Sequence, residues 1–233
     1  LAEHTATEQT GECYGAAFVY SGNFSAEIEK DQFDQIRFVM GLSEEQFSYS
    51  LSAGEVFYAP EVVLSYSGEG IAHLSHNFHY FARKHICRGK YKDKPRPVLL
   101  NSWEACYFDF DGEKIVALAE QAAEFGVELL VLDDGWFGQR DDDNSSLGDW
   151  EVNERKLGCS LRELSERVHQ KGVLFGIWIE PEMVSEDSNL YRSHPDWALQ
   201  IPGKKPVRAR NQLVLDFSNP EVVEYILEKI SDI

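Results

Sequence analysis

Residues 127–134 read VELLVLDD, an apolar run that ends in two carboxylates, and they follow the amphipathic stretch GEKIVALAEQAAEFG at 112–126. The same alternation continues to residue 230. The apolar runs are PVLLNSW (97–103), VELLVLDD (127–134), VLFGIWIE (173–180) and QLVLDF (212–217). Parallel strands covered by helices on both faces require such a pattern. The sequence therefore predicts four consecutive βα units.

The predicted helices carry their own boundary signals. Short polar side chains cap helix N-termini, proline suits the first turn, and glycine ends helices. A short helical segment is also predicted at SNLYRSHP (188–195). The boundary signals of the three longer helices are Asp111 with Gly126, Ser160 with Gly172, and Ser218 to Pro220.

The upstream part has a different period. Apolar and polar residues alternate over 13–66, which is typical of antiparallel strands with one face inward and the other in water. A helix is predicted from about Gly70, because Leu74, Phe78, Phe81 and Ala82 recur at helical spacing. The alternating runs are YGAAFVYS (14–21), FSAEIEKDQ (24–32), QIRFVMGL (35–42), FSYSLSAG (47–54) and EVVLSYSG (61–68).

A basic, proline-containing stretch, CRGKYKDKPRP (87–97), separates the two patterns and is typical of a connection between domains. We therefore predict a boundary near residue 90, with a β domain over 1–90 and an α/β domain over 91–233. The 233 residues are enough for two modest domains, and the 43% hydrophobic content indicates a globular chain.

Charge and cysteine usage exclude several classes of partner. The chain has 22 Lys and Arg against 40 Asp and Glu, a formal net charge of −18, so nucleic acid and anionic membranes are not expected as partners. The four cysteines form neither a CxxC pair nor a zinc-like cluster. With no apolar segment long enough to span a membrane, we expect a cytoplasmic protein with free thiols.

Periodicity does not distinguish a doubly wound sheet from part of a barrel. NSWEACYFDF, after the first strand, lacks the glycine-rich loop of nucleotide-binding folds. In a barrel, residues just past the strand C-termini face the active site. Carboxylates there accept hydrogen bonds from sugar hydroxyls, and indoles pack on the apolar face of a pyranose. The residues at these ends are Trp103, Asp133, Asp134, Trp178, Glu180, Glu182, Arg210 and Asp216.

Each of these residues also has a structural interpretation. One of Asp133 and Asp134 could cap the turn before Gly135, but a cap needs only one carboxylate. Glu180 and Glu182 could hold their loop through backbone N–H groups. Asp216 could equally serve the helix that follows.

The aromatic residues and the arginine leave the same choice open. Trp103 and Trp178 could be core residues or a platform for a sugar. Arg210 could be solvated or paired with a carboxylate. The remaining indoles are predicted to pack within loops; they are Trp136, Trp150 and Trp197.

Longer motifs carry a resemblance to one family. They are NSWEACYFDF, VLDDGWFGQRDDDNSSLGDWEVN, IWIEPEMVS, YRSHPDWAL and RNQLVLDFSNPEVVEYI. In unbroken order from residue 13 to residue 233, the sequence resembles the α-galactosidases of glycoside hydrolase family 36. The upstream half resembles the end of that family's N-terminal β-supersandwich.

The resemblance implies the C-terminal part of an antiparallel β-supersandwich followed by the first four βα units of a (β/α)8 barrel. It implies a retaining enzyme that hydrolyses terminal α-linked galactose from sugars such as melibiose and raffinose, without metal or organic cofactor. Asp133 and Asp134 resemble the pair that binds the galactose 4-OH and 6-OH. Trp103 and Trp178 resemble pocket aromatics, and Arg210 resembles a substrate-contacting arginine.

The family's nucleophile lies in a K-W-D-M-N-R motif after the fifth strand, and its acid/base aspartate lies further on. This sequence contains neither. We therefore expect a fragment that is inactive alone, with the catalytic aspartates beyond Ile233. The full-length parent is expected to be a homo-oligomer, possibly a tetramer. A transglycosylase, an α-N-acetylgalactosaminidase and a non-catalytic carbohydrate-binding protein remain alternatives.

Overall fold

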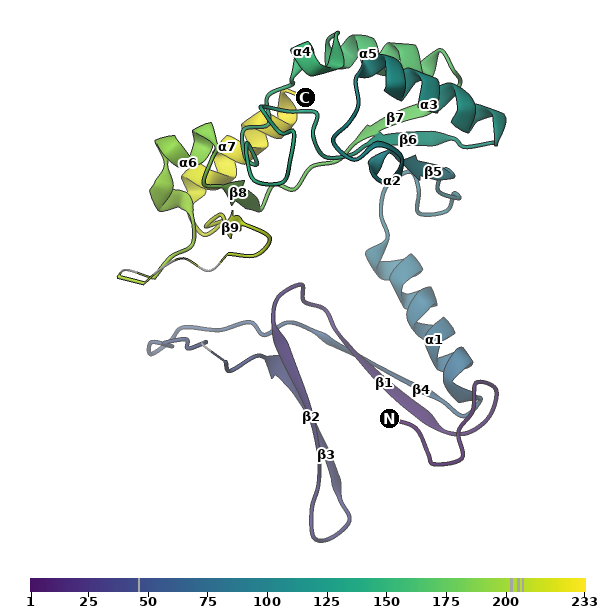
Figure 1. Ribbon diagram of the computed structural model, residues 1–233. Helices are drawn as coiled ribbons and strands as arrows, with labels where there is room; N and C mark the ends of the chain where they lie inside the picture. The colour runs from purple at the N-terminus through teal and green to yellow at the C-terminus, as the bar shows by residue number, and fades with distance from the viewer. Residues whose placement is uncertain (46, 202, 205, 207) are drawn as a thin grey trace. The chain divides into compact units, whose positions relative to one another are not determined.

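The computed structural model describes residues 1–45, 47–201, 203, 204, 206 and 208–233. It divides into two compact units, Leu1–Lys94 and Pro95–Ile233. The break lies four residues past the position near residue 90 expected from sequence. Each unit is described by itself (Figure 1).

The first unit contains two antiparallel strand pairs, as the alternating pattern predicts. β1 (Cys13–Phe18) pairs with β4 (Val62–Ser67), and β2 (Phe24–Lys30) pairs with β3 (Ile36–Leu42). Both pairs are hydrogen-bonded along their full length. The antiparallel assignment of four of the five alternating runs is therefore confirmed.

The predicted strand at 47–54 is wrong. Residues 47–54 lie outside strands, and local hydrogen bonds hold them instead. The Tyr49 hydroxyl donates to the Glu55 carboxylate at 2.9 Å, and the Ser52 backbone N–H donates to the same carboxylate at 2.9 Å. Alternation alone does not make a strand, because a strand also needs a partner with free N–H and C=O groups.

The helix predicted from about Gly70 is present as α1 (Gly70–Phe81), which continues as a π-helical turn over Ala82–Ile86. Its Leu74 and Phe78 side chains face β1. A methyl group added at Gly15 would lie 2.6 Å from the Phe78 ring, so this strand position has room only for glycine. The absence of a side chain at Gly15 therefore lets the helix approach the strand.

The second unit is built on a parallel sheet of β5 (Leu99–Asn101), β6 (Leu129–Leu132) and β7 (Leu174–Ile177), in that order. Helices α3 (Gly112–Glu124) and α5 (Leu161–His169) lie side by side over one face of the sheet (Figure 1). Short helices α2 (Trp103–Cys106) and α4 (Glu154–Leu157) lie in the connections. The first two predicted βα units are thus confirmed. The third is confirmed for its strand, β7, but a short strand at Met183–Ser185 comes between β7 and the helix predicted at 188–195.

The fourth predicted strand requires a correction. Gln212–Val214 forms β9, but β9 pairs antiparallel with β8 (Met183–Ser185) and not with the parallel sheet. An apolar run indicates a buried strand without saying which neighbour it will bond. The chain after β7 supplies that neighbour, because it turns at Pro181 and extends again as β8.

The remaining helices are α6 (Asn189–Ser193), a 3₁₀ turn over Pro195–Trp197, and α7 (Pro220–Ser231). Asp111 and Ser160 cap α3 and α5 as predicted, by accepting hydrogen bonds from the third backbone N–H after them. For α7, the predicted region 218–220 contains the cap, and the capping side chain is Asn219 with Pro220 in the first turn.

The hydrophobic core of the second unit lies between the sheet and its helices. Alternate residues of β6 point into it, and its helical side comes from α3 and α5. Fully buried members include Leu130, Leu132, Ile115, Ala119, Leu164 and Val168. This packing fixes the C-terminal ends of β5, β6 and β7, where the predicted site residues begin.

Candidate sugar-binding site

The two carboxylates after β6 have different surroundings. Asp134 is 5% exposed and forms an ion pair with Arg140, whose side chain is fully buried. Arg140 Nε donates to Asp134 Oδ1 at 2.9 Å and to Oδ2 at 3.1 Å, and Nη2 donates to Oδ2 at 2.8 Å. Such a fork fixes the plane of the carboxylate as well as compensating its charge.

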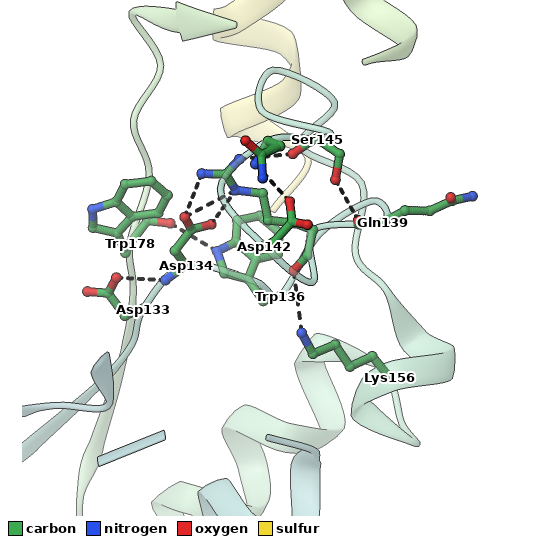
Figure 2. A network of polar contacts seen from close by, with 10 residues as sticks. Asp133, Asp134, Trp136, Gln139, Asp142, Ser145, Lys156 and Trp178 are labelled. Carbon is green, nitrogen blue, oxygen red and sulfur yellow. Dashed lines mark hydrogen bonds and ion pairs between the residues drawn. The ribbon is translucent and has the colours of Figure 1, made fainter. Parts of the chain in front are cut away.

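Asp133 is held by uncharged donors and is half-buried. Its Oδ1 accepts the Asp134 backbone N–H at 2.7 Å, and its Oδ2 accepts the Asn101 side-chain amide at 2.5 Å. Asp133 therefore takes the turn-capping role, and Asp134 does not share it. Figure 2 shows the two side chains next to each other in the loop after β6.

Asn101, at the end of β5, joins Asp133 to the first predicted indole. Its Oδ1 accepts the Trp103 backbone N–H at 2.8 Å, while its Nδ2 donates to Asp133. Trp103 is half-buried, and its ring packs edge-on against Tyr107 and Phe108, with centroids 5.2 and 5.0 Å away. The side chain is thus neither free in solvent nor enclosed in the core.

Trp178 follows β7 and is tied to the loop after β6. The Trp136 indole N–H donates to the Trp178 carbonyl oxygen at 3.0 Å, as Figure 2 shows. Trp178 is half-buried against the core, 6.3 Å from the Trp150 ring. Trp136, Trp150 and Trp197 are all buried, which confirms their predicted packing role.

Glu180 lies within electrostatic reach of the same group. Its pKa is raised, first by burial and then by the negative charge of Glu182, while Arg210 and Arg140 act to lower it. The Asp134 carboxylate contributes to the rise. The end of β7 and the loop after β6 therefore gather mutually repelling carboxylates that two arginines partly compensate.

Arg210 is exposed at the tip of a tight turn between Ala209 and Gln212. Arg210 and Asn211 have φ angles of 51° and 60°, the left-handed pair that a two-residue type I′ turn needs. The Asn211 side chain donates to Asn144 Oδ1 at 3.0 Å, so the turn is fastened to the loop that carries Arg140.

Asp216 has a structural role. Its Oδ1 accepts the Ser218 backbone N–H at 3.0 Å and the Ser218 hydroxyl at 2.5 Å, just before α7. Both contacts arrange the entry to the helix. This outcome favours the structural alternative for Asp216.

Sequence reasoning missed two residues that organise the site, Asn101 and Arg140. Asn101 ends an apolar strand, which is a signal that could have been noticed. Arg140 follows Asp134 by six residues in an acidic loop, and nothing in that spacing indicates that its side chain is buried. The described residues contain no group of three or more His, Cys, Asp or Glu side chains suited to a metal ion.

Two hollows on the surface of the second unit lie away from the predicted sugar-binding residues. One hollow, of about 740 Å³, lies along α7 beside Val223 and Leu227, and another, of about 480 Å³, is lined by Asp149, Asp187 and Arg192 among others. The walls of these two hollows include none of the predicted sugar-binding residues. No helix in the described part of the chain is long and apolar enough to cross a membrane.

The chain thus consists of an antiparallel β unit followed by an α/β unit. The α/β unit presents carboxylates and indoles at the C-terminal edge of a parallel sheet, an arrangement typical of carbohydrate-binding proteins. Two family models match the chain, the glycosyl hydrolase family 36 N-terminal domain over residues 1–52 and melibiase over residues 56–233. The chain belongs to the melibiase family.

Relatives and solved structures agree with this assignment. The chain is 63% identical over 230 residues to the bifunctional α-galactosidase/sucrose kinase AgaSK of Mediterraneibacter gnavus, covering 99% of this chain and 25% of that protein. It is 52% identical over 233 residues to α-galactosidase AgaA of Geobacillus stearothermophilus, covering 100% and 32%. The chain thus spans about a quarter to a third of these proteins.

A crystal structure of a variant of AgaA with raffinose superposes with a TM-score of 0.96 at 52% identity, over 99% of this chain and 32% of that one. The galactosidase domain of AgaSK gives a TM-score of 0.95 at 62% identity, over 99% and 32%. The chain therefore has the fold of the corresponding part of family 36 α-galactosidases.

Proposed function

We propose that this chain is a segment of a retaining α-galactosidase that hydrolyses terminal α-linked galactose from oligosaccharides such as melibiose and raffinose. The observation that carries the proposal is the pair Asp133 and Asp134, held in fixed orientations at a rim with two indoles. Relatives 63% and 52% identical are named α-galactosidases, and one solved relative contains raffinose.

In this proposal the chain supplies the galactose-recognition side of the pocket. Asp133 and Asp134 accept hydrogen bonds from galactose hydroxyls, Trp103 and Trp178 contact the sugar, and Arg210 donates to it from the tip of its turn. Paired carboxylates give direction to the hydroxyl contacts, and the indoles exclude water from the apolar sugar face.

The nucleophile and the acid/base aspartate are proposed to lie in parts of the protein outside this chain. The three parallel strands β5, β6 and β7 are proposed as the start of a (β/α)8 barrel, with the segment through α7 completing its first four βα units. The 233-residue chain alone is then expected to release no galactose, because the covalent step has no nucleophile.

The test is to express the full-length gene and measure galactose released from raffinose and melibiose. Release by the parent and none by the 233-residue chain is the expected result. A folded parent that releases no galactose would reject the proposal. Asp133→Asn and Asp134→Asn in the parent should each lower kcat/KM on the order of 100-fold, because each removes a charged acceptor from the sugar.

Oligomeric state and location are separate proposals. We propose a cytoplasmic homo-oligomer. The four cysteines, all free thiols in the structure, support the location, and the oligomeric state rests on the resemblance to family 36 α-galactosidases. Light scattering on the full-length protein and cell fractionation would test the two statements. A monomer, or a secreted protein, would contradict them.

A further inference from the structure

Arg140 makes more contacts than a simple counterion for Asp134 requires. Its Nε and Nη2 atoms form the fork with Asp134, and its Nη1 donates to the Ser145 carbonyl oxygen at 2.9 Å. The side chain has no exposed surface. A fully buried guanidinium is costly unless it is paired and hydrogen-bonded, and here it is both.

The fork leaves Asp134 able to bind a ligand. An ionised carboxylate has about four acceptor sites, and the three contacts from Arg140 leave at least one of them free. The plane of the carboxylate is fixed, so the direction of the free site is fixed too. A hydroxyl group that approaches Asp134 then meets an acceptor that needs no rearrangement.

The same guanidinium connects Asp134 to the turn that carries Arg210. Arg140 holds the Ser145 carbonyl, and the neighbouring Asn144 accepts the Asn211 side-chain amide at 3.0 Å. Asn211 is adjacent to Arg210 in the type I′ turn. The loop between Asp134 and Ser145 thus joins two of the proposed sugar contacts through one buried side chain.

We propose that Arg140 is a positioning residue for galactose recognition: it orients the Asp134 carboxylate and, through Ser145 and Asn144, the turn of Arg210. This proposal rests on the proposed function. Arg140 itself does not touch the sugar, since its side chain has no exposed surface.

The experiment uses the full-length protein with Arg140→Lys and Arg140→Met, each made also in an Asp134→Asn background. Lysine keeps the charge but lacks the planar fork. We expect Arg140→Lys to raise KM for raffinose on the order of 10-fold with a smaller change in kcat, and Arg140→Met to raise it further, since misplacement of a binding group weakens recognition. Lysine should therefore rescue part of the loss.

The second background separates positioning from general stability. If Arg140 acts largely through the Asp134 carboxylate, Arg140→Lys should change KM about threefold or less once Asp134 is asparagine, because contacting residues are not additive. Arg192→Lys is the matched control. Arg192 pairs with Asp187 at 2.7 Å, but both side chains are more than half exposed, so KM should stay unchanged.

Three outcomes would overturn the proposal: an unchanged KM in Arg140→Lys, an equal rise in KM in both Asp134 backgrounds, or loss of folding in Arg140→Lys, which would assign Arg140 to stability alone. Circular dichroism and the thermal midpoint identify the last case. A parent that releases no galactose rejects the proposed function and this proposal together. An active parent with an unchanged Arg140→Lys rejects only this one.

Discussion

The two units of the chain differ in how much of their apolar surface they bury. Among the described residues of Leu1–Lys94, Cys13 is the one buried hydrophobic side chain, while Phe33 is 73% and Leu64 70% exposed. In Pro95–Ile233, a continuous cluster of buried side chains runs from Cys106 to Ile226. Among the described residues, hydrogen-bonded strands are thus present in both units, but a cluster of buried hydrophobic side chains is present only in the second.

The difference shows that strands can form their hydrogen bonds without a hydrophobic core forming around them. The strand pairs of the first unit satisfy their backbone hydrogen bonds without removing much apolar area from water. The second unit also buries polar groups, including Arg140 and Asp134, and such groups need rigid surroundings. We therefore expect the second unit to be more sensitive to substitution.

The largest expected effect is in the core of the second unit. Trp136→Ala in the 233-residue chain should lower the free energy of unfolding by about 4 kcal/mol, because a fully buried indole leaves a cavity. Phe33→Ala in the first unit should change it by about 0.5 kcal/mol or less, because the ring is exposed. Urea titrations would compare the free energies of unfolding of the two variants. Similar losses would contradict the difference in core packing between the two units.

The next effect concerns the two adjacent carboxylates. Asp134→Asn should lower the free energy of unfolding by about 3 kcal/mol, because it leaves the buried Arg140 charge without its partner. Asp133→Asn should cost about 1 kcal/mol, because its contacts are with uncharged donors. Thermal denaturation of both variants checks the order, and an equal or reversed cost would contradict the assigned roles.

A smaller effect is expected from helix capping. Asp111→Ala removes the acceptor of the Lys114 backbone N–H at the start of α3 and should cost about 1 kcal/mol. Asp31→Ala in the first unit removes an exposed turn acceptor, bonded to Phe33 and Gln35, and should cost roughly half as much. Equal losses would show that the turn between β2 and β3 is as firmly held as α3.

The smallest effect is a pH dependence. Burial and the charge of Glu182 raise the pKa of Glu180 above its ordinary value of 4.5. The folded protein therefore retains a proton that the unfolded chain has lost, and stability falls as pH rises from about 4.5 through the raised pKa. Glu180→Gln should be stabilising relative to the wild type above this window, with the difference shrinking below it.

Thermal midpoints at pH 4 and pH 7.5 would measure the change for Glu180→Gln, with Glu27→Gln on the exposed strand β2 as the control. The stability advantage of Glu180→Gln over the wild type should be larger at pH 7.5 than at pH 4. The control, Glu27→Gln, should show no such increase. A gain of the same size at both pH values would contradict the assigned cause.

Much of the fold follows from local pattern, and the exceptions have physical reasons. Periodicity located α3, α5 and the three parallel strands, because each buries one face against the others. It failed at residues 47–54, where local side-chain bonds to Glu55 replaced a partner strand. It also did not identify β8 as the neighbour of β9, since a strand's partner depends on tertiary arrangement.

For the candidate site, the sequence indicated the strand-end residues but not how they are held. Asp133 and Asp134 look equivalent in sequence, yet one caps a turn and the other is paired with a buried guanidinium. The different roles of Asp133 and Asp134 depend on the backbone path that places Arg140 beside Asp134. This path turns at Gly138, which has a left-handed φ of 53°. Loop paths of this kind are set by packing among Trp136, Phe137 and Trp150 rather than by periodicity.

Two of the four cysteines are buried thiols that can report when each unit opens. Cys13, with no exposed surface, belongs to the first unit, and Cys106, 7% exposed, belongs to the second. An alkylating reagent reaches a buried thiol only when the structure around it opens. The rates at which Cys13 and Cys106 are alkylated under native conditions would therefore report the opening of each unit separately, in a single sample and without any introduced cysteine.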